Sequence, residues 1–67
     1  MLVSNILKEY KPLSMVSVNG KHFKVWEVPN TNQYAVSVES ADFTEIFHFD
    51  NFKAAETKYG VLIKGAV

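Results

Sequence analysis

The sequence predicts a single α+β domain over residues 1–67, with an N-terminal helix, a four-stranded antiparallel β-meander and a C-terminal helix. Three observations predict it. The chain opens with apolar residues at helical spacing, an Asn-Gly pair lies between two alternating runs, and the connections between runs are short. Short connections favour neighbouring antiparallel strands, so a meander is the simplest topology. A domain of this size buries only about 60% of its unfolded surface, which leaves roughly 3–10 kcal/mol of stability.

The first predicted helix covers Met1–Tyr10. Its apolar residues recur at spacings of three and four and form one stripe, made of Leu2, Val3, Ile6, Leu7 and Tyr10. Pro12 limits this helix, because the residue before a proline avoids the helical region of backbone space. A helix of about ten residues is marginal alone, so we expect it to pack on the sheet.

The most specific local signal is Asn19-Gly20, which lies between two β-rich runs. This pair suits a type I′ turn, whose two central residues both have positive φ. A two-residue turn fixes the register, so we expect four cross-strand pairs, Val18–Lys21, Ser17–His22, Val16–Phe23 and Met15–Lys24. The second strand should end near Val28-Pro29, since proline cannot donate a ladder hydrogen bond.

Two further strands and a helix complete the prediction. The strands are Tyr34–Glu39 and Thr44–Phe49, joined by Ser40–Phe43. The helix covers Asn51–Tyr59 and is capped at its start by Asp50 or Asn51. Its apolar stripe consists of Phe52, Ala55 and Tyr59. Gly60 suits the left-handed C′ position at its end. For Val61–Val67, a short edge strand and a helical continuation both stay open.

Alternation along the strands assigns their side chains to two faces, provided that no bulge intervenes. The expected core face carries Leu13, Met15, Trp26, Val28, Tyr34, Val36, Val38, Phe47 and Phe49. The opposite face is also rich in apolar residues, and we expect five of them to contact a partner or a second copy: Val16, Val18, Phe23, Val25 and Ile46. The alternative, equally open, is that the first helix covers this opposite face.

Charge is segregated along the chain although it sums to zero. Five acids and no lysine lie between Glu27 and Phe52, so this window has charge −5, while seven lysines and two acids give +5 elsewhere. The five acids form a predicted acidic patch for a basic partner or for the lysine-bearing end of a second copy: Glu27, Glu39, Asp42, Glu45 and Asp50. The plainer alternative is that strand ends and connections are simply solvated.

Candidate catalytic residues are few. His48 with Asp50, and Ser17 with His22, are the two pairs that acid–base chemistry could use. Neither pair has an identifiable third residue, Asp50 is also a candidate helix cap, and a cross-strand hydrogen bond is the plainer role for Ser17 and His22. Cysteine, P-loop and dinucleotide motifs are absent. We therefore expect no enzyme activity, no catalytic or metal-ligating residue and no cofactor.

The stretches HFKVWEVPNTNQYAVSVES and FHFDNFKAAETKYG together resemble the arm-binding domain of phage integrases, in which three strands precede a helix opened by Phe and Ala residues. The order of helix, meander and helix resembles a double-stranded-RNA-binding domain. Either resemblance implies a sheet-based nucleic-acid-binding domain, with Lys21, Lys24, Lys53 and Lys58 as candidate contacts. Arginine is absent and the net charge is zero, so we rank this function second.

The build of the chain, which is small, cysteine-free and aromatic-rich, resembles small phage and mobile-element accessory proteins, including anti-CRISPR and anti-restriction inhibitors. This resemblance implies a non-enzymatic interaction module that occupies a surface on a host protein or nucleoprotein. We expect a location in the host cytoplasm and no membrane partner, because the chain has neither a secretory pattern nor an apolar run near the ~18 residues of a membrane span. A homodimer would suit so thin a core.

Overall fold

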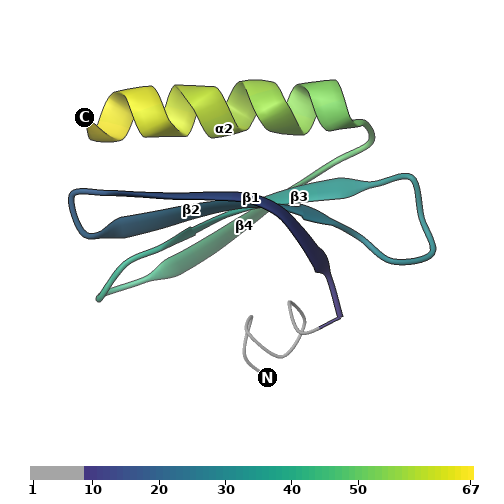
Figure 1. Ribbon diagram of the computed structural model, residues 1–67, viewed down its shortest axis with the longest axis horizontal. Helices are drawn as coiled ribbons and strands as arrows, with labels where there is room; N and C mark the ends of the chain where they lie inside the picture. The colour runs from purple at the N-terminus through teal and green to yellow at the C-terminus, as the bar shows by residue number, and fades with distance from the viewer. Residues whose placement is uncertain (1–8) are drawn as a thin grey trace.

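A computed structural model describes residues 9–67, which form an antiparallel sheet followed by one helix (Figure 1). The sheet order is β1-β2-β3-β4, so the predicted meander is confirmed. The elements are β1 (Lys11–Val18), β2 (Lys21–Glu27), β3 (Tyr34–Glu39), β4 (Thr44–Phe49) and α2 (Phe52–Ala66). Each strand therefore lies next to the strand that precedes it in the sequence.

The predicted helix Met1–Tyr10 is not part of the described fold. Its last two residues, Glu9 and Tyr10, form a turn and a bend, and the rest of the predicted helix lies outside the described residues. Within residues 9–67 the only helix follows the sheet, which corrects the predicted order of helix, meander and helix. Lys11, which precedes Pro12, already belongs to β1, as the backbone preference of a residue before proline requires.

The first hairpin has the register that its turn dictates. Asn19 and Gly20 have φ of 51° and 82°, as a type I′ turn needs. The four predicted cross-strand pairs, from Val18–Lys21 to Met15–Lys24, are all confirmed. Closer to the chain start, the register shifts between Pro12 and Ser14, because Leu13 is an extra residue in β1.

The connection between β2 and β3 decides which faces of the two hairpins coincide. The Val28 amide donates to the Gln33 carbonyl at 3.1 Å, and Thr31 bonds to both residues within the loop. Asn30 has a φ of 60°, in the left-handed region that Asn tolerates. This loop pairs Val25 with Val36 and Trp26 with Ala35. The prediction that Trp26 shares a face with Val36 is therefore wrong.

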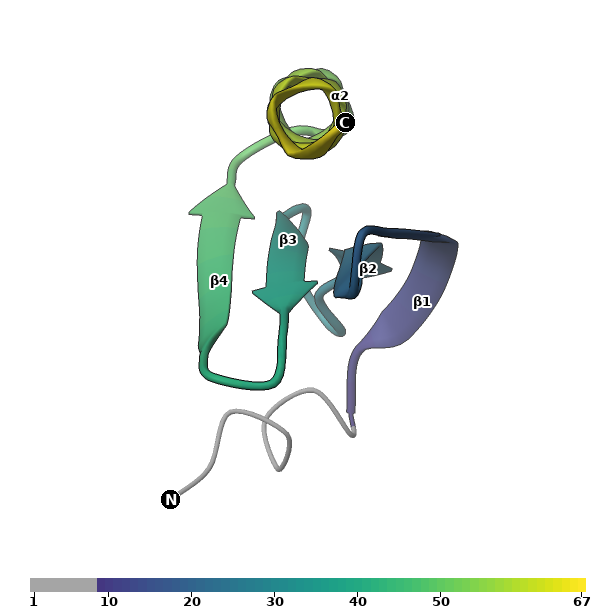
Figure 2. The ribbon, with the colours of Figure 1, turned by 90° about the vertical axis from the view of Figure 1, so that its left-hand side faces the viewer.

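One face of the sheet, which we call the helix face, is covered by α2 (Figure 2). Its centre holds the buried Phe23, Val25, Val36 and Val38, and Ala55 of α2 packs against Val25 and Val36. The predicted core face is thus half correct. Tyr34, Val36, Val38, Phe47 and Phe49 lie on the helix face, whereas the register places Met15 and Trp26 on the other side. We call that other side the far face.

Helix α2 is longer than predicted. Asn51 is its N-cap, and the Asn51 side chain accepts a hydrogen bond from the Ala54 amide at 2.8 Å. The helix continues through Gly60 to Ala66, so Gly60 is an interior residue and the alternative of a C-terminal edge strand is wrong. Leu62 packs against the core, and burying a leucine outweighs the ~1 kcal/mol that a helical glycine costs. Within residues 9–67, no helix is both long and apolar enough to cross a membrane.

Candidate functional site

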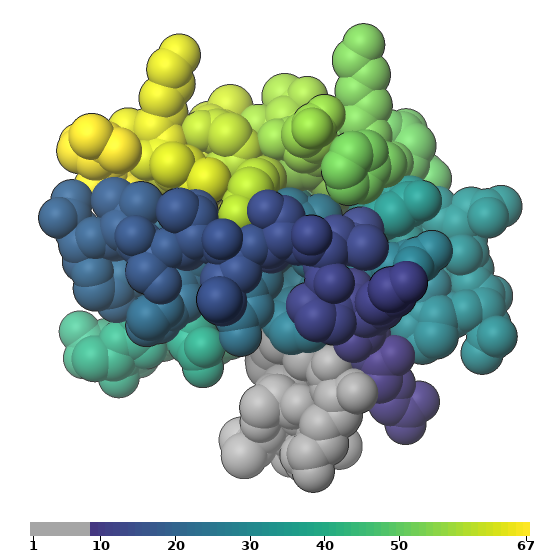
Figure 3. Space-filling model, in the orientation of Figure 1, coloured from purple at the N-terminus to yellow at the C-terminus, as the bar shows by residue number. Residues whose placement is uncertain are grey.

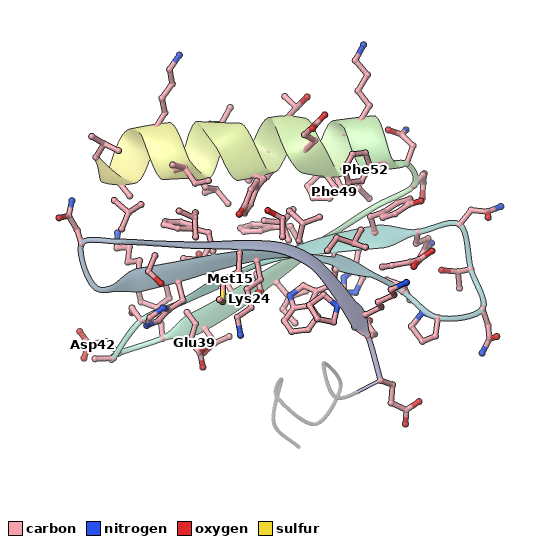
Figure 4. The ribbon with its side chains drawn as sticks, viewed as in Figure 1. Met15, Lys24, Glu39, Asp42, Phe49 and Phe52 are labelled. Atoms are coloured by element: carbon pink, nitrogen blue, oxygen red, sulfur yellow. The ribbon has the colours of Figure 1, made fainter. Side chains whose placement is uncertain are left out.

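The five acids predicted as one patch divide between the two ends of the sheet. Glu39, Asp42 and Glu45 lie where β3 turns into β4, and Figure 4 shows Glu39 and Asp42 together at this end. Glu27 and Asp50 lie at the opposite end, because β2 and β4 both finish there. The structure therefore places three of the five predicted carboxylates at one end of the sheet, with Glu39 on the far face and Glu45 on the helix face.

The four candidate lysines also separate. Lys24 lies on the far face, with its ammonium 5.3 Å from the centroid of the Trp26 ring. Lys53 and Lys58 belong to α2, and the Lys58 ammonium lies 4.7 Å from the centroid of the Phe47 ring. Lys21 lies at the start of β2, near the carboxylates of the turn end. No single surface carries all four lysines.

The five residues predicted to form an exposed apolar face do not share one. Phe23 and Val25 are each only 2% exposed, since both lie under α2. Val16 pairs with Phe23 and is half-buried on the same helix face as Val18, while Ile46 pairs with Ser37 on the far face. The loop between β2 and β3 explains the difference, because it reverses the predicted relation between the two hairpins.

An exposed aromatic residue accompanies the three grouped acids. Phe43 occupies the β3–β4 turn and remains 44% exposed. The Phe43 carbonyl accepts a hydrogen bond from the Ser40 amide at 2.9 Å, and the Ser40 hydroxyl accepts one from the Asp42 amide at 3.3 Å. We call Glu39, Asp42, Phe43 and Glu45 the turn surface. Its tip projects at the lower left of the space-filling view (Figure 3).

A groove of about 270 Å³ lies beside the turn surface, against the C-terminal half of α2. Its lining is mainly apolar and comprises Lys21, Phe23, Val38, Phe43, Glu45, Val61, Leu62, Gly65 and Ala66. Lys21 is the one cation in this lining. The groove therefore offers an apolar recess next to exposed carboxylates, which is the arrangement of an interface centre with a polar rim.

The far face combines buried and exposed polar groups. At its centre, the Trp26 indole donates to the Ser37 hydroxyl at 2.9 Å, and both residues are buried. Nearer the margins, the Ser17 hydroxyl oxygen lies 2.7 Å from Nδ1 of His22, so the predicted cross-strand hydrogen bond is confirmed. The Tyr10 hydroxyl lies 2.9 Å from Nε2 of His48. Three pairs of hydrogen-bonding side chains therefore lie on this face.

The structure brings few of the candidate catalytic residues into an arrangement suited to acid–base or metal chemistry. His48 is paired with Tyr10, and Asp50 is an exposed residue of the link before α2. In the part of the chain that the structure describes, no three His, Asp or Glu side chains gather closely enough to hold a metal ion.

Comparison with protein-family models, with curated proteins and with solved structures finds no match to this chain. The site is therefore defined by its own residues. Sequence reasoning missed Phe43, which was assigned to a connection. The available signal was an aromatic residue within a short turn, next to Asp42 and close to Glu45. Val61 and Leu62 were not singled out either, because for Val61–Val67 an edge strand and a helical continuation both stayed open.

Proposed function

We propose that this chain is a small non-enzymatic interaction module that acts by occupying a basic surface on a host protein or nucleoprotein. The observation that carries the proposal is the turn surface, where three exposed carboxylates and the exposed Phe43 ring lie at one end of the sheet beside an apolar groove. In this proposal, the chain is a phage-type accessory protein or inhibitor that works in the host cytoplasm.

Phe43 is suited to be the anchor of such an interface. Aromatic residues supply large contact areas at a small entropic cost, and they dominate the energetics of many interfaces. The turn around Phe43 is short and internally hydrogen-bonded, so less conformational freedom is lost when it binds. A partner side chain entering the groove would meet Phe43, Val61 and Leu62 together.

The carboxylates define the chemistry of the partner. Glu39, Asp42 and Glu45 present three negative charges at one end of the molecule, with Lys21 as a neighbouring cation. Complementary charge accelerates encounter and fixes orientation more than it adds affinity. A lysine- or arginine-rich surface that also offers an apolar side chain is the matching partner. Where that surface normally binds nucleic acid, occupation by this chain would block the nucleic acid.

Affinity capture with matched baits tests the proposal. The baits are the unaltered chain, Phe43→Ala, Asp42→Lys and the control Glu56→Lys, which reverses an exposed charge on α2 away from the turn surface. We expect the unaltered chain and Glu56→Lys to retain the same bacterial partner, and Phe43→Ala and Asp42→Lys to lose it. Retention should also weaken as salt rises. A partner retained equally by all four baits would contradict the proposal.

A sheet-based nucleic-acid-binding domain is the second candidate. The observation that favours it is Lys24 on the far face, next to Trp26 and on the same face as His22 and His48. Fluorescence anisotropy with short DNA and RNA duplexes at low salt tests this candidate. It predicts weaker binding for Lys24→Gln and unchanged binding for Lys53→Gln, and the absence of any binding at low salt would exclude it.

A further inference from the structure

The two edge strands of the sheet differ in how much of their outer backbone is available for pairing. In an antiparallel ladder, hydrogen-bonded and non-hydrogen-bonded pairs alternate. The type I′ turn makes Val18–Lys21 the closing hydrogen-bonded pair of the first hairpin. Ser14, Val16 and Val18 therefore bond inward to β2. Met15 and Ser17 direct their amides and carbonyls away from the sheet.

Among residues 9–67, the outer edge of β1 carries little of the protection usual for edge strands. In natural proteins, charged residues, prolines or bulges keep edge strands from pairing with another chain. In β1, Pro12 and the extra residue Leu13 protect only the beginning. The segment Ser14–Val18 has no charged residue, and Met15 is 64% exposed. Figure 2 shows β1 as the edge of the sheet farther from the helix layer.

The other edge, β4, is protected by comparison. Its segment includes the exposed Glu45, and the Lys58 side chain reaches from α2 over Phe47. Its His48 side chain is already paired with Tyr10. A strand added to β4 would have to accommodate a carboxylate and a lysine at close range, whereas a strand added to β1 would meet neither.

We propose that β1 pairs with β1 of a second copy of this chain, antiparallel and about a two-fold axis at Val16. This register joins Met15 of each copy to Ser17 of the other through the amides and carbonyls that these residues direct away from β2, with four hydrogen bonds in total. It places Val16 against Val16 of the second copy in a non-hydrogen-bonded pair, where side chains approach most closely. Two four-stranded sheets become one continuous eight-stranded sheet.

A second copy fits this edge because the segment is complementary to itself. Valine meets valine on the helix face, and Ser17 meets Met15 on the far face, so no like charges are brought together. The nearest cation on the far face is Lys24 of β2 (Figure 4). The two copies of Lys24 would be three strand spacings apart, about 14 Å, which exceeds the ~8 Å screening length at physiological salt. This inference is independent of the turn surface and of the proposed function.

Sedimentation over a concentration series tests the edge with a matched pair of variants. Met15→Lys and Thr44→Lys each add a lysine at an exposed far-face position of an edge strand, on β1 and β4 respectively. We expect the unaltered chain and Thr44→Lys to dimerise equally, and Met15→Lys to dimerise at least ~10-fold more weakly, since its lysines would face each other diagonally. A monomer at every concentration up to ~1 mM, or a dimer unaffected by Met15→Lys, would overturn the proposal.

Disulfide trapping tests the register itself. The chain has no cysteine, so a single introduced thiol can only pair with that of another copy. In the proposed register, Val16→Cys places two sulfurs across the axis within disulfide reach, and Ser14→Cys holds them roughly 13 Å apart along the strands. We expect mild oxidation to cross-link Val16→Cys and to leave Ser14→Cys monomeric under denaturing conditions. Equal cross-linking of both variants, or none in the first, would overturn the register.

Discussion

The helix face and the far face of this sheet bury their central residues by different means. On the helix face, Val25 and Val36 pack against Ala55, Tyr59 and Leu62 of α2, and Phe23 beside them is equally buried, so this core is apolar. On the far face, Trp26 and Ser37 are buried as a hydrogen-bonded pair between polar, partly exposed neighbours. The helix face is thus stabilised by the burial of apolar surface. The stability of the far face depends on the hydrogen bond between its two buried polar groups.

The largest expected effect is on the helix face. Replacing Phe23 with Ala removes one of the two largest fully buried side chains and should lower the free energy of unfolding by about 3–5 kcal/mol. Since the whole domain has only roughly 3–10 kcal/mol, much of the variant should be unfolded at 25 °C. Urea unfolding followed by Trp26 fluorescence measures this. The matched control Phe43→Ala, in the exposed turn, should lose less than about 1.5 kcal/mol, and equal losses would contradict the assignment of the core.

The far face should show a smaller loss with a different signature. Trp26→Phe removes the indole donor and leaves the buried Ser37 hydroxyl without its partner, at a cost of about 1–3 kcal/mol. A double-mutant cycle with Ser37→Ala, based on the free energy of unfolding of each variant, checks the cause. We expect the two losses of stability to be less than additive, because Ser37→Ala removes the hydroxyl that Trp26→Phe leaves unsatisfied. Strict additivity would show that the polar pair contributes nothing.

Substitution in α2 should change stability in the opposite direction. Gly60 lies inside the helix, and nothing approaches within 4 Å of the position that a Cβ would take. Gly60→Ala should therefore raise the free energy of unfolding by about 0.5–1 kcal/mol, through the higher helix propensity of alanine. Thermal unfolding measures the gain. Gly20→Ala is the contrasting control and should destabilise, since Gly20 has a φ of 82°.

The smallest effect belongs to the margin of the far face. The Ser17 hydroxyl bonds to His22 in an exposed position, where water can replace the lost partner. Ser17→Ala should change the free energy of unfolding by no more than about 0.5 kcal/mol in urea unfolding. A loss as large as that of Trp26→Phe would remove the distinction between the centre and the margin of this face.

The sequence was informative about each hairpin and uninformative about how the hairpins join. Asn19-Gly20 determines one register, and alternation along β3 and β4 determines another. The relation between these two registers depends on the number of residues in the loop around Asn30, and no periodic pattern in the sequence specifies that number. A change of one residue in that count exchanges the two faces of a whole hairpin. For the same reason, the face expected to contact a partner or the first helix included Phe23 and Val25, which lie in the core under α2.

The ends of the helices were the other weak point. The N-terminal apolar stripe predicted a helix over Met1–Tyr10 that is absent from the described residues, and Lys11, the residue before Pro12, already belongs to β1. For α2, Gly60 suggested an end, but the burial of Leu62 beyond it favours continuation. The acidic end of the sheet followed from strand order and charge. Phe43 did not, because an apolar residue in a turn has no periodicity to reveal its exposure.

The hydrogen bond from the Asn19 side chain to the Ala66 carbonyl, at 2.7 Å, has a consequence for local unfolding. The start of α2 is joined covalently to β4, so the helix can detach from the sheet only from its other end, where Asn19 holds it. The same end borders the groove at Phe43. Breaking this hydrogen bond would widen the groove before the rest of the domain unfolds. Asn19→Gly keeps the positive φ and removes the hydrogen bond. Amide hydrogens near Leu62 should therefore exchange faster with solvent, while those of β2 and β3 keep their exchange rates.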